Sequence, residues 1–229
     1  MNRISQNYWR SLGWLAVALS GWVFQAAAQK LAPLDIKLPA PAFIGTPTDK
    51  APDPNVEPVS KTPRAPFLAP EGVTNVAFKK KVTCSTNTPA ERLAKITDGE
   101  IEPTENNVVM LPRNPQWVQI DLESPQEIYA IVFWFACDKP RVYHGVVVQV
   151  ADGPGFGAGD NVRTLFNNDA ANKDGVGAGT DREYFETNEG KLIDAKGAKA
   201  RYVRLYSNGN SEAKYNEYTE VEVFGRPAK

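Results

Sequence analysis

Short segments in which apolar and polar residues alternate follow one another along the chain from residue 72 onward. The clearest lie near the C-terminal end, where Val203 and Leu205, and later Val221 and Val223, alternate with polar or charged neighbours. A period of two residues is typical of a β-strand with one buried face. The pattern predicts strands at residues 80–84, 117–122, 128–136, 145–151, 164–167, 184–187, 200–207 and 219–225, and a helical turn at 89–95. No long segment has helical periodicity, so the sequence predicts an all-β sandwich.

The longest predicted connection, residues 167–182, has the sequence NNDAANKDGVGAGTDR. Asp169, Asn172 and Asp174 supply oxygen groups of the kind found in a calcium-binding loop, but the glutamate twelve residues after the first ligand of an EF-hand is absent. Loops of this length are usually functional or mobile. We therefore expect a flexible surface loop, with a second metal site as the alternative.

Ten prolines lie between residues 29 and 71. Each proline lacks a backbone donor and biases the preceding residue toward an extended conformation. The sequence thus predicts a Pro-rich linker at 29–71, largely extended or disordered, that tethers a domain at 72–227. Short apolar patches at 42–44 and 66–68 are candidates for contact with that domain.

The first 28 residues have the three regions of a secretory signal peptide. Arg3 and Arg10 precede an apolar run at 12–24, and small residues end at Ala28. The run is shorter than the roughly 20 residues that span a bilayer, although an uncleaved anchor remains the alternative. We expect a signal peptide at 1–28, cleavage after Ala28, and export to the periplasm or the extracellular space.

Cys84 and Cys137 are the only cysteines. An exported chain meets an oxidising environment, in which an even pair of cysteines tends to form a disulfide. The alternative is two separate, small buried thiols. Metal binding by the pair is disfavoured, because the chain has one histidine and no Cys-x-x-Cys spacing.

The 229 residues carry 26 basic and 27 acidic side chains, for a net charge of −1. This balance gives no electrostatic reason to expect nucleic acid or an anionic membrane surface as partner. One histidine, and the absence of G-x-S-x-G and H-E-x-x-H motifs, argue against a catalytic triad or a zinc protease. We expect no enzymatic activity.

Three motifs occur in an informative order: an Asp98-Gly99 turn, the strand WVQIDL at 117–122, and the closing strand EVEVFG at 220–225. Together they resemble the discoidin (F5/8 type C) family and the related family 32 carbohydrate-binding modules, over about residues 72–227. The resemblance implies a jelly-roll β-sandwich of the galactose-binding-domain-like type. Such a domain is usually a non-catalytic binding module.

Some members of this family bind a structural calcium ion. The resemblance carries that site to the Lys95 carbonyl, the Asp98 carboxylate, the Glu100 carbonyl, Thr104, the Thr219 carbonyl and the Glu220 carboxylate. Carbonyl and carboxylate oxygens are the ligands that calcium prefers. One departure is that Pro103 stands where the family commonly has the threonine. The alternative is that Asp98 caps a turn and Glu220 pairs with a cation such as Lys95.

The resemblance also implies ligand binding by loops at one end of the sandwich. Arg141, Tyr143 and His144 are our candidates, because an aromatic ring and planar donors suit a sugar. The alternative is that Arg141 pairs with Asp138 and His144 caps the next strand.

Trp117 is predicted to pack in the core. Carbohydrate is the expected ligand; the second hypothesis is a protein-interaction or adhesion module of the cell envelope, and the third is an accessory subunit of a glycoside-processing enzyme.

Overall fold

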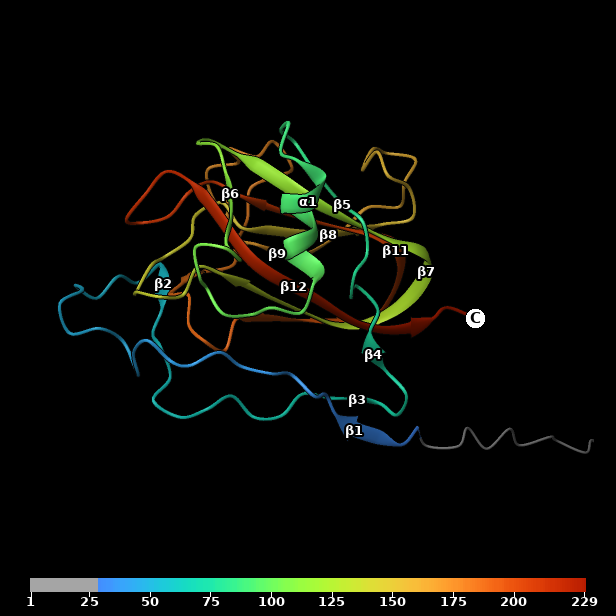
Figure 1. The fold of residues 1–229 in the computed structure, drawn as a ribbon, viewed down its shortest axis with the longest axis horizontal. Coiled ribbons are helices and arrows are strands. Elements are labelled where there is room, and N and C mark those ends of the chain that lie inside the picture. Colours follow the sequence, from blue (N-terminus) through green and yellow to red (C-terminus); the bar gives the residue numbers. More distant parts are fainter. Residues whose placement is uncertain (1–28) are drawn as a thin grey trace, which may run out of the picture.

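Two long, bent strands determine how the layers are built (Figure 1). The computed structural model describes residues 29–229, and in it β7 (Gln116–Phe135) pairs antiparallel with β11 (Lys191–Ser207). Shifts in the pairing register at 194–198 and 200–202 mark irregularities where the pair bends. Each strand therefore contributes one part to each of two layers.

The first layer combines the first part of β7 with the last part of β11. Three short strands complete it: β5 (Val82–Cys84) pairs with β7, β8 (Val147–Ala151) pairs with β11, and β9 (Arg163–Asn167) pairs with β8. All of these pairs are antiparallel. This agrees with the alternation of apolar and polar residues in the sequence, which is typical of antiparallel strands with one buried face.

The second layer is built on the last part of β7, which pairs with β12 (Asn216–Pro227). The strands β4 (Thr74–Asn75) and β6 (Val109–Leu111) pair with β12. The predicted helical turn is present as α1 (Ala90–Leu93), followed by the 3-10 helix η1 (Ala94–Thr97), which lies against β12.

The inward-facing residues of the two layers form one apolar core. Val118 and Ile120 from the first layer and Ile131 and Phe133 from the second are fully buried. These are alternate residues of the predicted strands, as the period of two requires. The prediction of an all-β sandwich is confirmed.

Residues 29–71, which we call the arm, lie against the outer face of the second layer (Figure 1). Leu34, Ile36 and Phe67 pack on a buried cluster of outward-facing strand residues: Ala130, Val132, Trp134 and Phe224. The segment is extended, as its prolines predict, but the description as a tether needs correction. Its apolar residues pack on the sheet because β7 is apolar on this face as well. The predicted signal peptide lies outside the described residues.

Two short ladders hold the arm in place. Its two ends pair with each other through β1 (Leu31–Pro33) and β3 (Leu68–Pro70), which are antiparallel. Its middle pairs with the domain, because β2 (Val56–Glu57) lies parallel to β10 (Glu183–Tyr184). The arm therefore forms a third layer over part of the sandwich.

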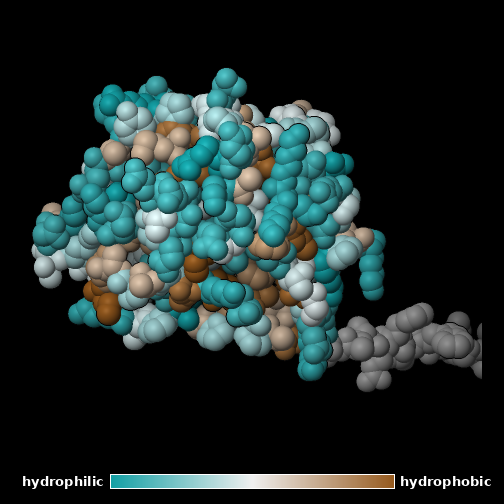
Figure 2. Space-filling model, viewed as in Figure 1, coloured by the Kyte–Doolittle hydropathy of each residue, from teal (hydrophilic) through white to brown (hydrophobic). Residues whose placement is uncertain are grey.

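Apolar residues remain exposed on the arm. Leu31, Leu38, Ile44 and Leu68 are each at least 45% exposed. Figure 2 shows apolar colour in the lower part of the molecule, where Figure 1 places the arm. Within residues 29–229, no helix has the length and apolar character needed to cross a bilayer.

The loop at 167–182 contains turns that its own polar side chains close. Asp169 Oδ2 accepts from the Asp174 amide at 2.8 Å, and Asn172 Oδ1 accepts from the Gly177 amide at 2.7 Å. Burial, together with the neighbouring Asp169, raises the pKa of Asp174 to about 7. The Asp169 and Asn172 side chains therefore close turns, whereas both carboxyl oxygens of Asp174 are buried without a partner in the described chain.

The disulfide prediction is wrong for this structure, because Cys84 and Cys137 are both free thiols. Cys84 lies at the end of β5 in the first layer, and its sulfur donates to the Thr86 carbonyl at 3.2 Å. Cys137 lies just beyond the end of β7 in the second layer and is buried. The two residues belong to different layers, so each thiol has its own surroundings.

We expect the contact between the arm and the sheet to contribute to stability. Ile36→Ala should lower the free energy of unfolding by about 1–2 kcal/mol, because it removes a partly buried side chain from the apolar cluster. Leu31→Ala is the matched control, since Leu31 is 54% exposed. Its effect should stay below about 0.5 kcal/mol. Chemical denaturation measures both, and equal effects would contradict the packing of the arm.

The two thiols should react differently. Burial raises the pKa of Cys137 to about 12, so it should be inert in the folded protein. Partial burial acts to raise the pKa of Cys84, but hydrogen bonds with Thr86 and Thr88 lower it overall. A thiol titration without reductant should find one accessible thiol in the folded chain and two after unfolding. Loss of the fast-reacting thiol in Cys84→Ser would identify it; no thiol in the unfolded chain would contradict the structure.

Candidate functional site

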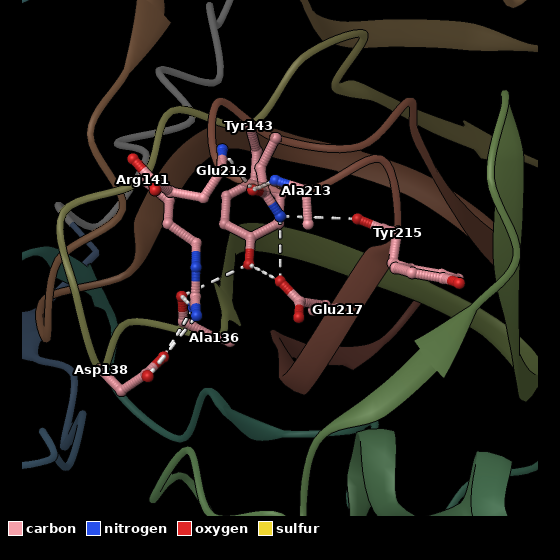
Figure 3. Close-up of polar contacts among 9 residues, drawn as sticks. Ala136, Asp138, Arg141, Tyr143, Glu212, Ala213, Tyr215 and Glu217 are labelled. Atoms are coloured by element: carbon pink, nitrogen blue, oxygen red, sulfur yellow. Dashed lines mark hydrogen bonds and ion pairs between the residues drawn. The ribbon is translucent and has the colours of Figure 1, made fainter.

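Arg141 is held by the protein itself (Figure 3). Its Nη1 donates to the Asp138 carboxylate at 2.6 Å and to the Ala136 carbonyl at 3.0 Å. The residue is 8% exposed. The structure therefore has the alternative arrangement, in which Arg141 pairs with Asp138 and fastens the chain that leaves β7.

Tyr143 is a core residue and offers no face to a ligand. It is 0% exposed, and its ring stacks on Phe135 with the centroids 4.2 Å apart. Its hydroxyl donates to Glu217 Oε2 at 3.0 Å, and Asn210 donates to the same oxygen at 2.9 Å (Figure 3). The expected stacking role of Tyr143 therefore needs correction: its apolar ring packs on the aromatic cluster at the end of the core.

His144 lies nearer the surface than its two neighbours. Its side chain is 41% exposed, and its Nδ1 lies 2.7 Å from Glu183 Oε1. Its backbone bonds with the loop at 208–209. The three predicted ligand residues thus belong to one segment, but they do not form a common binding surface.

Trp117 also differs from expectation. It is half-buried and faces away from the core, with the Arg204 guanidinium 4.3 Å from its ring centroid. Phe156, from the loop after β8, lies on the same guanidinium at 4.0 Å. Arg204 is further bonded to Gln119 Oε1 at 2.9 Å through its Nε. This cluster covers the outer face of the first layer, and its donors are taken up by the protein.

The predicted calcium residues are partly brought together, because η1 packs on β12. The Gly99 amide donates to Glu220 Oε1 at 3.2 Å. Asp98 caps the turn by accepting from the Glu100 amide at 3.0 Å, and Lys95 pairs with its other oxygen at 3.0 Å. Thr104 is exposed and begins the next turn. In residues 29–229, no three acidic, histidine or cysteine side chains form a group that could hold a metal, so carbonyl ligands would be needed.

Glu220 nevertheless has the features of a cation ligand. It is 0% exposed, and its Oε2 has no partner in the described chain. The adjacent Thr219 hydroxyl is also buried without a partner. Burial and the nearby Glu222 raise the pKa of Glu220 to about 9. A buried carboxyl without a partner is costly, so Glu220, Asp98 and the surrounding carbonyls fit a hard cation, whereas Thr104 adds little.

A concavity lies between the arm and the start of β11. It is a cleft of about 590 Å³. One wall is formed by residues 38–45 and 57–64 of the arm, and the other by residues 184–192. We call it the arm cleft. None of Arg141, Tyr143 and His144 lines it.

The walls of the arm cleft combine apolar rings with hydroxyl groups. Phe43 and Phe185 supply half-buried aromatic rings. Ser60, Thr62 and Thr187 supply hydroxyls from both walls. A mixture of this kind is typical of a small-molecule site, in which a few polar groups orient a ligand against apolar surface.

An ion pair and two rings fix the inner wall. Lys191 Nζ lies 3.0 Å from Glu57 Oε2, which joins β11 to the arm. The same ammonium lies 4.5 Å from the ring centroid of Tyr184 and 4.9 Å from that of Phe166. Cation–π contacts of this geometry are attractive. Lys191 therefore positions the arm relative to the sandwich.

Arg64 fastens the returning part of the arm to the turn before β11. Its Nη1 donates to the Gly190 carbonyl at 3.0 Å and its Nη2 to the Glu189 carbonyl at 2.9 Å. Its amide donates to Glu189 Oε1 at 2.7 Å. Burial lowers the pKa of Arg64, while Glu189 acts in the opposite direction. Within residues 29–229 the guanidinium itself is hydrogen-bonded to carbonyl oxygens and to no carboxylate.

Gly190 is required where the turn meets β7. Its φ is +62°, and a Cβ would lie 2.7 Å from the Phe133 carbonyl and 2.7 Å from the Trp134 ring. The Trp134 Nε1 donates to the Asn188 carbonyl at 2.9 Å, and Asn188 donates to the Pro39 carbonyl at 3.2 Å. The close approach that glycine permits thus brings the turn to the arm.

Sequence reasoning missed the arm cleft because half of it comes from the segment read as a linker. Two features of the sequence indicate that this segment packs on the domain. The run at 131–135 is apolar on both faces and requires cover on both sides. The patches at 42–44 and 66–68 are the apolar part of the arm that could supply it.

No protein-family model matches the sequence, and no curated protein matches it. Solved structures with a similar strand arrangement include the family 32 carbohydrate-binding module CBM32 of AlyQ, in complex with 4,5-unsaturated mannuronic acid. That module is 19% identical, the match covers 64% of this chain and 96% of the module, and the TM-score is 0.47. Family 32 modules, which the sequence resembles, are therefore among the similar structures.

Two further structures are similar. Chitosan-binding module 1 from a chitosanase/glucanase of Paenibacillus sp. IK-5 is 20% identical, with 66% of this chain and 99% of the module covered and a TM-score of 0.43. A family 89 glycoside hydrolase from Clostridium perfringens is 16% identical over 67% of this chain, with a TM-score of 0.49, and the match spans 15% of that enzyme. At these identities and scores the similarity concerns the fold, and function must be argued from the site.

Proposed function

We propose that the protein is an exported, non-catalytic binding module that recognises carbohydrate in the arm cleft. The observation that carries this proposal is the composition of the cleft, in which aromatic rings, hydroxyls and a guanidinium face a volume of about 590 Å³. Ligand pockets usually measure roughly 300–1,000 Å³. The cleft has room for a short saccharide.

The chemistry of the walls suits a sugar. A pyranose has an apolar face that packs on an aromatic ring, which Phe43 or Phe185 can supply. Its hydroxyls both donate and accept, as do Ser60, Thr62 and Thr187 on the two walls. Binding to an open cleft of this kind is expected to be weak at each site, so that repeated ligands would raise the avidity.

An adhesion module of the cell envelope is the second candidate. It is favoured by the apolar rim of the arm cleft, where Ile44 is 78% exposed and Leu38 is 45% exposed. Exposed apolar residues that lie together are a common mark of protein interfaces. A partner protein at this rim would compete with saccharide for the same surface.

We also propose a structural calcium ion at Glu220. The buried Oε2 without a partner and the nearby Asp98 support it. The Lys95, Glu100 and Thr219 carbonyls and Thr104 complete the set that the family resemblance implies. The ion would supply positive charge to a buried carboxylate and would join η1 to β12.

Glycan binding should depend on the arm. On a glycan array, residues 29–229 should bind a defined class of sugar, and Phe43→Ala should weaken that binding about tenfold, because it removes a stacking ring. Phe78→Ala is the matched control, since Phe78 is 47% exposed and lies outside the cleft.

Replacing His144 with Ala should also leave glycan binding unchanged, because His144 lies outside the arm cleft. Equal losses in the Phe43 and Phe78 variants would contradict the site. An array with no bound glycan, in a folded chain that captures a protein through Leu38 and Ile44, would favour the adhesion module.

Glu220→Gln should lower the melting temperature in calcium but much less in chelator. In calcium the variant loses a metal ligand, whereas in chelator it replaces a buried carboxyl by a neutral group of the same shape. Differential scanning calorimetry measures the two differences. Equal losses in both buffers would refute the metal site.

A further inference from the structure

The side chains that line the arm cleft carry one more positive than negative charge. Three cationic side chains, Lys61, Arg64 and Lys191, and two anionic ones, Glu57 and Glu189, line the cleft. The chain as a whole has a net charge of −1. The cleft is therefore locally positive on a slightly negative molecule, which favours an anionic ligand.

The excess charge lies on the returning part of the arm. Lys191 is paired with Glu57 at 3.0 Å, so this cation is already neutralised. The ammonium of Lys61 forms no ion pair within residues 29–229, and Lys61 is exposed on the cleft wall. Arg64 lies three residues later on the same segment.

Arg64 is positioned to receive a carboxylate. Two of its N–H groups are held by the Glu189 and Gly190 carbonyls, which fixes the plane of the guanidinium. A guanidinium carries five N–H donors, and the others have no partner in the part of the chain that the structure describes. A planar, pre-oriented guanidinium with free donors binds carboxylates well.

We propose that the arm cleft prefers carboxylated saccharides, with a uronic acid carboxylate on Arg64 and Lys61. This inference rests on the proposed carbohydrate function and specifies its ligand class. The sugar ring packs on the aromatic wall while the carboxylate lies against the returning part of the arm. A neutral sugar would leave the ammonium of Lys61 without a counter-ion, and Arg64 with only the nearby Glu189 carboxylate.

The test compares matched ligands in which a carboxylate is free or is neutralised as its methyl ester. Oligosaccharides of galacturonate, glucuronate and mannuronate are titrated into residues 29–229 by calorimetry, each beside its methyl ester. We expect the tightest ligand to be a free uronate that binds roughly tenfold more tightly than its ester. Added salt should reduce this ratio, because it screens the charges.

Two variants locate the preference. Arg64→Gln and Lys61→Gln should each reduce the ratio of uronate to ester binding several-fold, and the ratio is compared within each variant because Arg64→Gln also removes bonds that hold the cleft wall. Lys61→Gln keeps the test independent of folding, since Lys61 is exposed. Lys30→Gln is the charge-matched control, because Lys30 pairs with Glu71 outside the cleft and should not alter the ratio.

The possible results separate the acidic preference, its placement on Lys61 and Arg64, and the carbohydrate function. Esters or neutral glycans that bind as tightly as free uronates would overturn the acidic preference and leave the carbohydrate function standing. An unchanged ratio in both variants would overturn the placement on Lys61 and Arg64. Absence of any saccharide binding would overturn both proposals, and tighter binding of poly-aspartate than of every uronate would overturn the saccharide class.

Discussion

The structure depends on the burial of that face of β7, in the second layer, that points away from the core. Ala130, Val132 and Trp134 point away from the core, yet each is 0% exposed. A sheet that is apolar on both faces must be covered on both faces, because exposed apolar area costs about 25 cal/mol per Å². The arm supplies the second cover with Leu34, Ile36 and Phe67. What looks like a linker in composition is therefore part of the folded unit.

This cover also creates the candidate site. The arm passes over the sheet, pairs with β10, and returns through Arg64, so that a cleft remains between it and the start of β11. The turn at Gly190 reaches under the arm because a glycine can approach Trp134 so closely. The rigid sheet and the extended arm thus each contribute one wall, and neither wall has a binding surface by itself.

The sequence predicts the strands well and the site poorly, for a physical reason. Alternation at Val203 and Leu205 reports burial on one face of a strand directly, so strand positions follow from it. Tyr143 and Arg141 lie outside regular strands, where the direction of a side chain depends on tertiary contacts such as Phe135 and Asp138. The resemblance to a family covers about residues 72–227 and therefore says nothing of the arm.

The candidate cation site at Glu220 and the arm cleft are connected through paired residues of the second layer. Glu220 pairs with Trp134 across β12 and β7, and Trp134 in turn bonds to Asn188, which bonds to the arm at Pro39. A cation at Glu220 would hold β12 and η1 beside the same tryptophan that positions the wall of the cleft. Without its arm the domain would expose Ala130, Val132 and Trp134 and would lose the wall that carries Lys61 and Arg64, so residues 72–229 alone are the wrong unit in which to look for the ligand.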